Sequence, residues 1–271
     1  MFAIRQSGLT QHCAMSAMES STKKYVGESV DSISQQVSTQ GTTPVLRVNE
    51  IFGPTIQGEG PDAGKPAVFL RLARCNLTCE WCDTRYSWDL ESYPEIGSVM
   101  DVGEIAERLK REVVSDSTLI VVTGGEPLLQ TKGLEALVPL LYDNAIAFET
   151  NGTLPPSKLL DEWCSHWTVS PKLENSGVAK ELRYRPKVLE TFAEMGAAFK
   201  FVAWESESFD EIDEIVETHC IEPASVWIMP EGTEGDMLCD VARVIVDDVI
   251  SRGYNLSMRH QVLIWGDTRG V

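Results

Sequence analysis

The 271-residue sequence contains no apolar run that approaches the length of a membrane-spanning helix. Its N-terminus lacks a basic start followed by an apolar stretch, so we expect no secretory signal. Basic residues are scarce, with 23 Lys and Arg against 41 Asp and Glu, and the net charge is −18. A surface this acidic repels phosphate backbones and shows no basic patch, so we expect neither a nucleic-acid partner nor a membrane partner.

Cysteine and histidine are also few, and the cysteines are unevenly placed. Of seven cysteines, three fall close together, at Cys75, Cys79 and Cys82. The others are scattered: Cys13, Cys164, Cys220 and Cys239. An odd number of cysteines with a close triplet favours a reducing compartment over a disulfide framework, so we expect a cytoplasmic protein.

The first 44 residues are rich in Ser, Thr and Gln and show little periodicity. We expect residues 1–44 to be a disordered N-terminal extension. Residues 45–271 then form the folded domain, because 43% of the chain is hydrophobic, which is enough for a sizeable core.

After residue 44, short apolar strands alternate with amphipathic helices. We predict strands over residues 44–52, 67–73, 119–123, 145–149, 167–170, 197–202, 225–229 and 255–259. We predict helices over residues 102–114, 134–142, 186–195, 208–219 and 236–252. Repeated strand–helix units at such short intervals indicate an α/β fold with a parallel sheet, either open or curled into a barrel.

The cysteine triplet is the strongest chemical signal in the sequence. Thiolate sulfur binds both zinc and iron–sulfur clusters. A structural zinc needs four protein ligands, and no second Cys-x-x-Cys or His pair lies nearby to complete the set. An iron–sulfur cluster held by three cysteines keeps one iron open for a substrate or cofactor. We therefore favour a reactive cluster, with a structural zinc or three unliganded cysteines as the alternatives.

A second motif, Thr123-Gly124-Gly125-Glu126-Pro127, follows a β-branched strand. Paired glycines let a ligand approach the backbone without a Cβ in the way. Glu126 can then accept hydrogen bonds from an amino group of that ligand. Taken alone, the motif favours a plain Gly-Gly turn that the proline ends.

Together, the triplet and the Gly-Gly-Glu-Pro motif resemble the radical S-adenosylmethionine (SAM) superfamily. The resemblance implies that Cys75, Cys79 and Cys82 hold a 4Fe–4S cluster, whose fourth iron chelates the amino and carboxylate groups of SAM. It also implies that the Gly-Gly-Glu segment contacts that amino group, and that one electron from the cluster cleaves SAM to a 5′-deoxyadenosyl radical. The implied fold is a partial TIM-like barrel of parallel strands, curled and incomplete, with the open cluster at one end.

The segments around these motifs narrow the resemblance. They are residues 50–60, 69–72, 81–88, 149–153, 169–172 and 200–202. Their order and content resemble the 7-carboxy-7-deazaguanine synthase family, which makes residues 45–271 a radical SAM catalytic domain. The family implies a carbon–nitrogen lyase of queuosine precursor biosynthesis, which converts 6-carboxy-5,6,7,8-tetrahydropterin to 7-carboxy-7-deazaguanine with loss of ammonia. It further implies a magnesium ion, a homodimer and a flavodoxin-like electron donor.

The functional residues of this family carry over by position. The resemblance assigns contacts with SAM to Trp81, Cys82, Asp83, Gly125, Ser170, Pro171 and Lys172. It assigns contacts with the pterin substrate to Ile56, Gln57, Gly58, Arg71, Thr123 and Val271. It assigns a magnesium ligand to Thr84, whose hydroxyl is a hard oxygen that suits Mg²⁺, although one hydroxyl alone makes no site.

Several of these positions also have ordinary structural interpretations. Arg71 should face opposite to Leu70 and Leu72 on its strand, where its guanidinium can pair with a substrate carboxylate or simply with solvent. Lys200 can point into the barrel as a substrate ligand or snorkel to the surface. The run that ends at Val271 can fold back over the site or remain a mobile tail.

Two other functions are compatible with part of the sequence. A radical SAM activase, which places a glycyl radical on a partner enzyme, would share the triplet but not the segments at residues 56–60, 81–84 and 170–172. A zinc-stabilised binding module without catalysis would be colourless and hold one zinc. The enzyme would instead be brown and contain iron and sulfide.

Overall fold

The computed structural model describes residues 43–271, which form one compact unit. The disorder expected for residues 1–44 falls outside the described residues, apart from Thr43 and Pro44. The division of the chain between residues 44 and 45 therefore stays a prediction.

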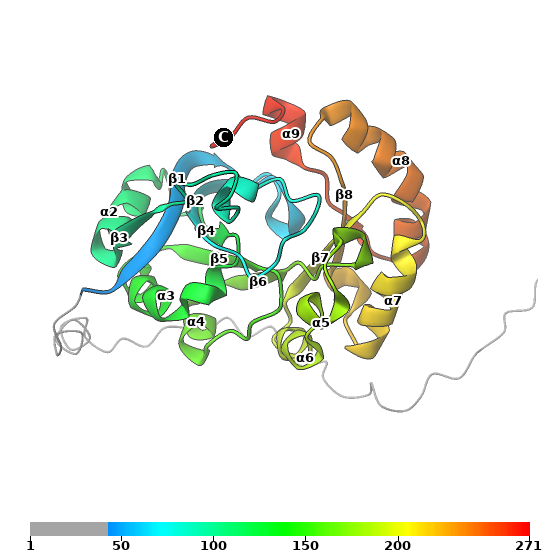
Figure 1. The fold of residues 1–271 in the computed structure, drawn as a ribbon, viewed down its shortest axis with the longest axis horizontal. Coiled ribbons are helices and arrows are strands. Elements are labelled where there is room, and N and C mark those ends of the chain that lie inside the picture. The colour runs from blue at the N-terminus through cyan, green and yellow to red at the C-terminus, as the bar shows by residue number, and fades with distance from the viewer. Residues whose placement is uncertain (1–42) are drawn as a thin grey trace, which may run out of the picture. The chain divides into compact units, whose positions relative to one another are not determined.

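A sheet of nine strands runs through the described residues (Figure 1). In spatial order its strands are β3 (Ser98–Asp101), β1 (Val45–Ile56), β2 (Pro66–Leu72), β4 (Leu119–Gly124), β5 (Ala145–Thr150), β6 (His166–Val169), β7 (Ala198–Ala203), β8 (Val226–Pro230) and β9 (Asn255–Leu256). All neighbours from β2 to β9 are parallel. The two outer strands, β3 and β9, do not pair with each other, so the predicted α/β fold with an incomplete barrel is confirmed.

The strands β1 and β3 depart from the expected parallel arrangement. β1 pairs antiparallel with both β2 and β3. Only residues 57–65 connect β1 to β2, and parallel neighbours need a crossover of about a dozen residues or more. β3 has no counterpart among the predicted strands, because four residues are too few to show a periodic pattern.

The last predicted strand, over residues 255–259, is wrong beyond its first two residues. β9 ends at Leu256, and the Ser257 hydroxyl then accepts a hydrogen bond from the backbone N–H of Gly60 (2.7 Å). The chain leaves the sheet at this point, and Arg259 reaches the cavity described below instead of closing a strand.

Helices pack along the outside of the sheet (Figure 1). They are α2 (Val102–Glu112), α3 (Thr131–Leu137), α4 (Lys158–Trp163), α6 (Pro186–Glu194), α7 (Ser208–Thr218) and α8 (Gly235–Arg252). Two short helices, α5 (Lys180–Arg183) and α9 (His260–Trp265), add no residue to this core, and α9 lines the cavity described below. Asp101 caps α2, since its carboxylate accepts hydrogen bonds from the N–H groups of Gly103 (2.8 Å) and Glu104 (3.3 Å). Among the described helices, none has the length and apolar character needed to cross a membrane.

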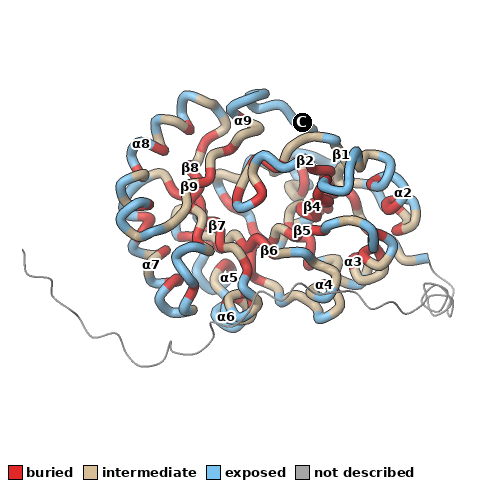
Figure 2. The backbone as a smooth tube through the Cα atoms, turned by 180° about the vertical axis from the view of Figure 1, so that it is seen from behind, coloured by how far each residue is buried: buried red, intermediate tan, exposed pale blue. Residues whose placement is uncertain are grey.

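Along β2 and β7, side chains alternate between the core that the helices cover and the face that carries the site. On β2, Leu70 is fully buried in the core that the helices cover, whereas Arg71 points to the opposite face, as expected. On β7, Phe199 and Phe201 join the same core, and Lys200 between them faces the cavity. Figure 2 shows buried residues concentrated along the strands and exposed residues on the outer turns of the helices. The inner face of the curled sheet is thereby free to carry polar side chains.

Candidate active site

A cavity of about 290 Å³ lies at the carboxyl ends of the parallel strands. Its walls include strand ends, the loop at residues 73–88 that carries the cysteines, and residues 266–271 at the C-terminus. The predicted site residues that line it are Ile56, Gln57, Gly58, Arg71, Cys75, Cys79, Trp81, Cys82, Asp83, Thr84, Thr123, Gly125, Ser170, Lys172 and Val271. Pro171 is buried outside this set, so it supports its neighbours instead of facing the cavity.

The three cysteines are free thiols on the loop after β2. Cys79 is buried, Cys75 and Cys82 are half-buried, and all three pack with Leu77 and Val178. Burial raises the pKa of the Cys75 thiol to about 11 and also raises the pKa of Cys79. Thiols of this kind become thiolate ligands when a metal displaces the proton.

Backbone hydrogen bonds fix both ends of this cysteine loop. The Arg74 N–H donates to the Ser87 carbonyl (2.7 Å), and the Arg74 carbonyl accepts from the Glu126 N–H (2.9 Å). Arg74 itself has a φ of +79°, a conformation that residues with a Cβ rarely adopt. The loop is therefore closed on itself and anchored to the end of β4.

The paired glycines make this anchoring sterically feasible. A Cβ on Gly125 would lie 2.2 Å from the Arg74 carbonyl oxygen and 2.8 Å from the Cys75 Cβ. A Cβ on Gly124, whose φ is +154°, would lie 2.3 Å from the Leu72 carbonyl oxygen. Both positions therefore need glycine for close backbone packing, whatever contact Gly125 makes with a ligand.

Glu126 has a different role from the one its motif suggests. Its buried carboxylate accepts hydrogen bonds from the N–H groups of Leu128 (2.9 Å) and Asn151 (2.8 Å) and from the Thr150 hydroxyl (2.9 Å). Burial nevertheless raises the pKa of this carboxyl group. Glu126 is fully buried and is not among the residues that line the cavity, so it braces the loops after β4 and β5.

The residues predicted to contact SAM meet on the cysteine-loop side of the cavity. The Lys172 ammonium donates to the Ser170 hydroxyl (2.9 Å) and lies 5.3 Å from the centre of the Trp81 ring. The Trp81 indole N–H donates to the Asn175 carbonyl (3.0 Å). This wall therefore combines a fixed aromatic face with a positive charge close to the thiols.

Arg71 also lines the cavity. Its Nε donates to Glu50 (2.8 Å), and its guanidinium carbon lies 5.6 Å from the centre of the Phe52 ring. Among the described residues, no hydrogen-bond acceptor meets its two terminal nitrogens. Thr123 ends β4 and lines the same cavity. The outer end of the guanidinium fork is thus available to a ligand.

The C-terminal tail folds back over the cavity, beside β1 (Figure 1). Arg269 donates to the second carboxylate oxygen of Glu50 (2.8 Å) and to the Asn49 side chain (3.0 Å). Its guanidinium carbon also lies 3.8 Å from the centre of the Tyr86 ring. Val271 lines the cavity, which favours the folded-back interpretation of the tail over the mobile one.

Residues 71–222 match the Radical SAM superfamily. The 7-carboxy-7-deazaguanine synthase of Pyrobaculum aerophilum is 37% identical, over 84% of this chain and 98% of its own length. The chain belongs to the 7-carboxy-7-deazaguanine synthase family. The corresponding synthase of Hyperthermus butylicus is 39% identical over 71% of this chain and 80% of its own. The crystal structure of QueE from Escherichia coli covers 80% of this chain and 94% of its own with a TM-score of 0.61 and 26% identity.

Membership in this family implies a 4Fe–4S cluster and SAM, and the described residues suit both. Three free thiols on one loop line a cavity together with the cationic Lys172. Within residues 43–271, no group of three His, Cys, Asp or Glu side chains is placed to hold one metal ion by itself. A magnesium ion at Thr84 would therefore take most of its ligands from SAM, substrate or water.

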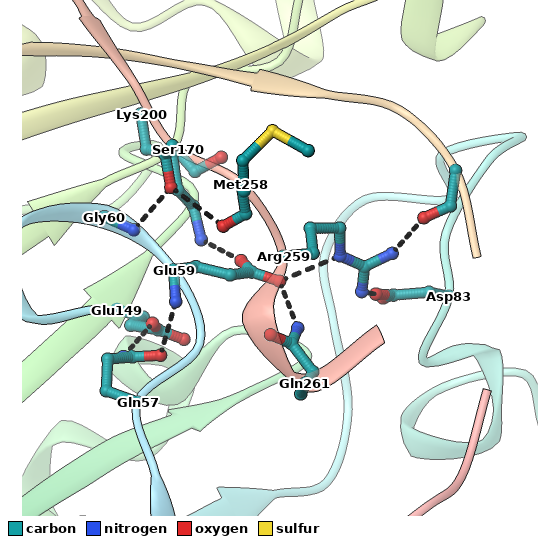
Figure 3. A network of polar contacts seen from close by, with 12 residues as sticks. Gln57, Glu59, Gly60, Asp83, Glu149, Ser170, Lys200, Met258, Arg259 and Gln261 are labelled. Atoms are coloured by element: carbon teal, nitrogen blue, oxygen red, sulfur yellow. Dashed lines mark hydrogen bonds and ion pairs between the residues drawn. The ribbon is translucent and has the colours of Figure 1, made fainter. Parts of the chain in front are cut away.

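A buried ionic network centred on Glu59 forms another part of the cavity (Figure 3). Its carboxylate accepts hydrogen bonds from Lys200 (2.5 Å), Arg259 (3.0 Å) and Gln261 (2.7 Å). Burial opposes the ionisation of Glu59, but the Lys200 and Arg259 charges outweigh it and hold the pKa of Glu59 well below its usual value. Arg259 also donates to Asp83 of the cysteine loop.

Arg259 and Glu50 are not among the site residues predicted from the sequence, although both line or border the cavity. Arg259 lies 200 positions from Glu59, so no local spacing signals their contact. Its place just beyond the carboxyl end of the last parallel strand is the signal that could have found it. Lys200 points into the cavity and is paired there, so it does not snorkel to the surface.

Proposed function

We propose that this chain is a carbon–nitrogen lyase that converts 6-carboxy-5,6,7,8-tetrahydropterin to 7-carboxy-7-deazaguanine with loss of ammonia. The product is a precursor of queuosine and related 7-deazapurines. The observation that carries the proposal is that the cysteine triplet, the wall around Trp81 and the guanidinium end of Arg71 line one cavity. The names of the relatives supply the product, and the family resemblance supplies the substrate and the loss of ammonia.

The residues that would hold the cluster and SAM are assigned from the family. When bound, the 4Fe–4S cluster and SAM supply the 5′-deoxyadenosyl radical chemistry. The cluster would be held by Cys75, Cys79 and Cys82. SAM would be held by Trp81, Cys82, Asp83, Gly125, Ser170 and Lys172, with Pro171 as a support behind them.

The substrate side offers groups that match the chemistry of a carboxypterin. The free end of the Arg71 fork suits the substrate carboxylate. The Gln57 side-chain N–H donates to Glu149 (2.9 Å), and its side-chain oxygen accepts from the Glu59 N–H (3.2 Å), so both polar groups of this side chain are held in place. The remaining contacts are assigned to Ile56, Gly58, Thr123 and the terminal Val271.

Further parts of the proposal come from the family resemblance. They are a magnesium ion at Thr84, a homodimer and a flavodoxin-like electron donor. An open cluster also requires a reducing environment, which supports a cytoplasmic location.

The test is anaerobic reconstitution of the full chain with iron and sulfide, followed by incubation with SAM, a reductant and the carboxypterin. We expect 7-carboxy-7-deazaguanine and ammonia, identified by mass spectrometry. A reconstituted enzyme that cleaves SAM but forms no deazaguanine would refute the proposed substrate.

A Cys79→Ala variant is the control for the cluster. It should lose SAM cleavage while its circular dichroism spectrum stays that of the parent. SAM cleavage at the parent rate by this variant would refute the cluster assignment.

A further inference from the structure

The indole of Trp88 makes a direct contact with one of the three cluster cysteines. Its Nε1–H donates a hydrogen bond to the Cys82 sulfur at 3.2 Å. Within the described residues this is the shortest polar contact to any of the three sulfurs. The others are Leu77 N to Cys75 (3.4 Å), Thr84 Oγ1 to Cys82 (3.6 Å) and Asn151 Nδ2 to Cys75 (3.9 Å).

The backbone holds Trp88 where this contact can form. Arg85–Ser87 form one short 3-10 turn, and the Trp88 N–H donates to the Arg85 carbonyl (3.0 Å). The Ser87 carbonyl accepts from the Arg74 N–H, the bond that closes the cysteine loop. Trp88 is therefore positioned by the same contacts that position Cys75 and Cys82.

The chemistry of this contact concerns charge on sulfur. An indole N–H is a donor only, and it bonds more strongly as the charge on its acceptor increases. Reduction of an iron–sulfur cluster by one electron adds negative charge that the ligand sulfurs share. Hydrogen bonds to those sulfurs therefore favour the reduced form and raise the reduction potential.

We propose that Trp88 is a positioning residue that raises the reduction potential of the cluster through its hydrogen bond to Cys82. This inference rests on the proposed function, because it presumes the cluster. A higher potential makes it easier for the external electron donor to reduce the cluster, which is the step before SAM cleavage.

A matched pair of substitutions separates the hydrogen bond from the aromatic ring. Trp88→Phe removes the N–H and keeps a ring at the position. Trp81→Phe removes an indole N–H from the same loop, but that N–H donates to the Asn175 carbonyl and not to a sulfur. Full-length wild type and both variants are reconstituted anaerobically, and each cluster is titrated without SAM, with the reduced form followed by electron paramagnetic resonance.

In Trp88→Phe we expect the ratio of reduced to oxidised cluster at a fixed potential to fall about tenfold, a shift of about 59 mV for a one-electron couple. The cluster of Trp81→Phe should have the same reduction potential as the wild-type cluster. An unchanged potential in Trp88→Phe, or an equal shift in both variants, would overturn the proposal while leaving the proposed function intact. Wild-type protein that forms no cluster would instead overturn the proposed function, and this inference with it.

If Trp88→Phe loses its iron, its cluster has no potential to measure, so a second variant is needed. Trp88→Met fills the volume with a flexible side chain that has no donor, and it should show the same downward shift. If both variants fold, as judged by circular dichroism, but neither holds iron, Trp88 is needed for cluster assembly and the proposed tuning role is wrong.

Discussion

At the scale of single residues, Arg71 is where the cavity can recognise a carboxylate. The Glu50 carboxylate accepts a hydrogen bond from the Arg71 Nε–H, and the two terminal guanidinium nitrogens remain available to a ligand. We expect Arg71→Ala to weaken binding of the carboxypterin about tenfold to a hundredfold, because a charge-assisted hydrogen bond contributes about 1.5–3 kcal/mol. SAM binding should stay unchanged, as measured by anaerobic calorimetry with each ligand alone. Equal losses for both ligands would reassign Arg71 to a structural role.

A substitution at Gly125 tests how closely the cysteine loop must pack against the end of β4. A methyl group there would collide with the Arg74 carbonyl, and that atom belongs to the backbone, which cannot simply rotate away. We expect Gly125→Ala to destabilise the fold by about 1–3 kcal/mol and to lower the iron content after reconstitution. Urea unfolding and iron analysis measure the two effects.

Gly235→Ala is the matched control for that substitution. Its Cβ would meet only Leu263 at an ordinary 3.6 Å, and it lies at the start of α8. Normal stability and full iron content in Gly125→Ala would show that the loop does not depend on the glycine.

At the scale of elements, the strands that the sequence predicts well are those buried on both faces. β4 is a short apolar run and β7 is apolar apart from Lys200, with residues such as Val121 and Phe199 fully buried, so their composition marks them. The direction of β1 is less visible, because it depends on the length of its connection to β2. β3 is too short to show a pattern, and β9 ends where Ser257 makes a side-chain contact with the distant Gly60.

The C-terminal tail is an element whose position depends mainly on Arg269. We expect Arg269→Ala to raise the KM for the carboxypterin about three- to tenfold, since a half-exposed ion pair contributes up to about 1 kcal/mol and the stacking on Tyr86 about 0.5–1 kcal/mol. The affinity for SAM should not change. Steady-state kinetics of the reconstituted enzyme measure the effect.

Arg243→Ala removes the same charge from an exposed position on α8 and should leave the KM unaltered. A normal KM in Arg269→Ala would mean that the C-terminal tail stays in place without the contacts of Arg269 with Glu50 and Tyr86.

At the scale of the whole molecule, the site is assembled from contacts that no local pattern reveals. The cysteine triplet and the paired glycines are compact motifs, and their chemistry is visible in the sequence. The contact between Glu59 and Arg259 joins positions 200 residues apart, and the one between Lys200 and Glu59 joins positions 141 apart. Only the curling of the sheet brings these charges together, so the sequence predicts the cofactor side of the cavity better than its ionic network.

This network makes a definite prediction for the pH dependence of stability. The pKa of Glu59 in the folded state is held below its usual 4.5, so the unfolded chain binds that proton more readily. The stabilisation is therefore fully present above the unfolded pKa and is lost as the pH falls below it. We expect the wild-type free energy of unfolding, measured in urea, to decrease from about pH 6 to about pH 4.

Glu59→Gln should remove part of that decrease and, at neutral pH, cost about 3–5 kcal/mol because it leaves buried cations without their counterion. Other carboxylates with lowered pKa values, such as Glu50 and Asp62, act in both proteins, so the difference between the two pH curves isolates Glu59. Glu107→Gln, at an exposed position on α2, should run parallel to the wild type. Parallel curves for Glu59→Gln as well would mean that the buried carboxylate contributes no ionic stabilisation, because its pKa would then be the same in the folded and unfolded chains.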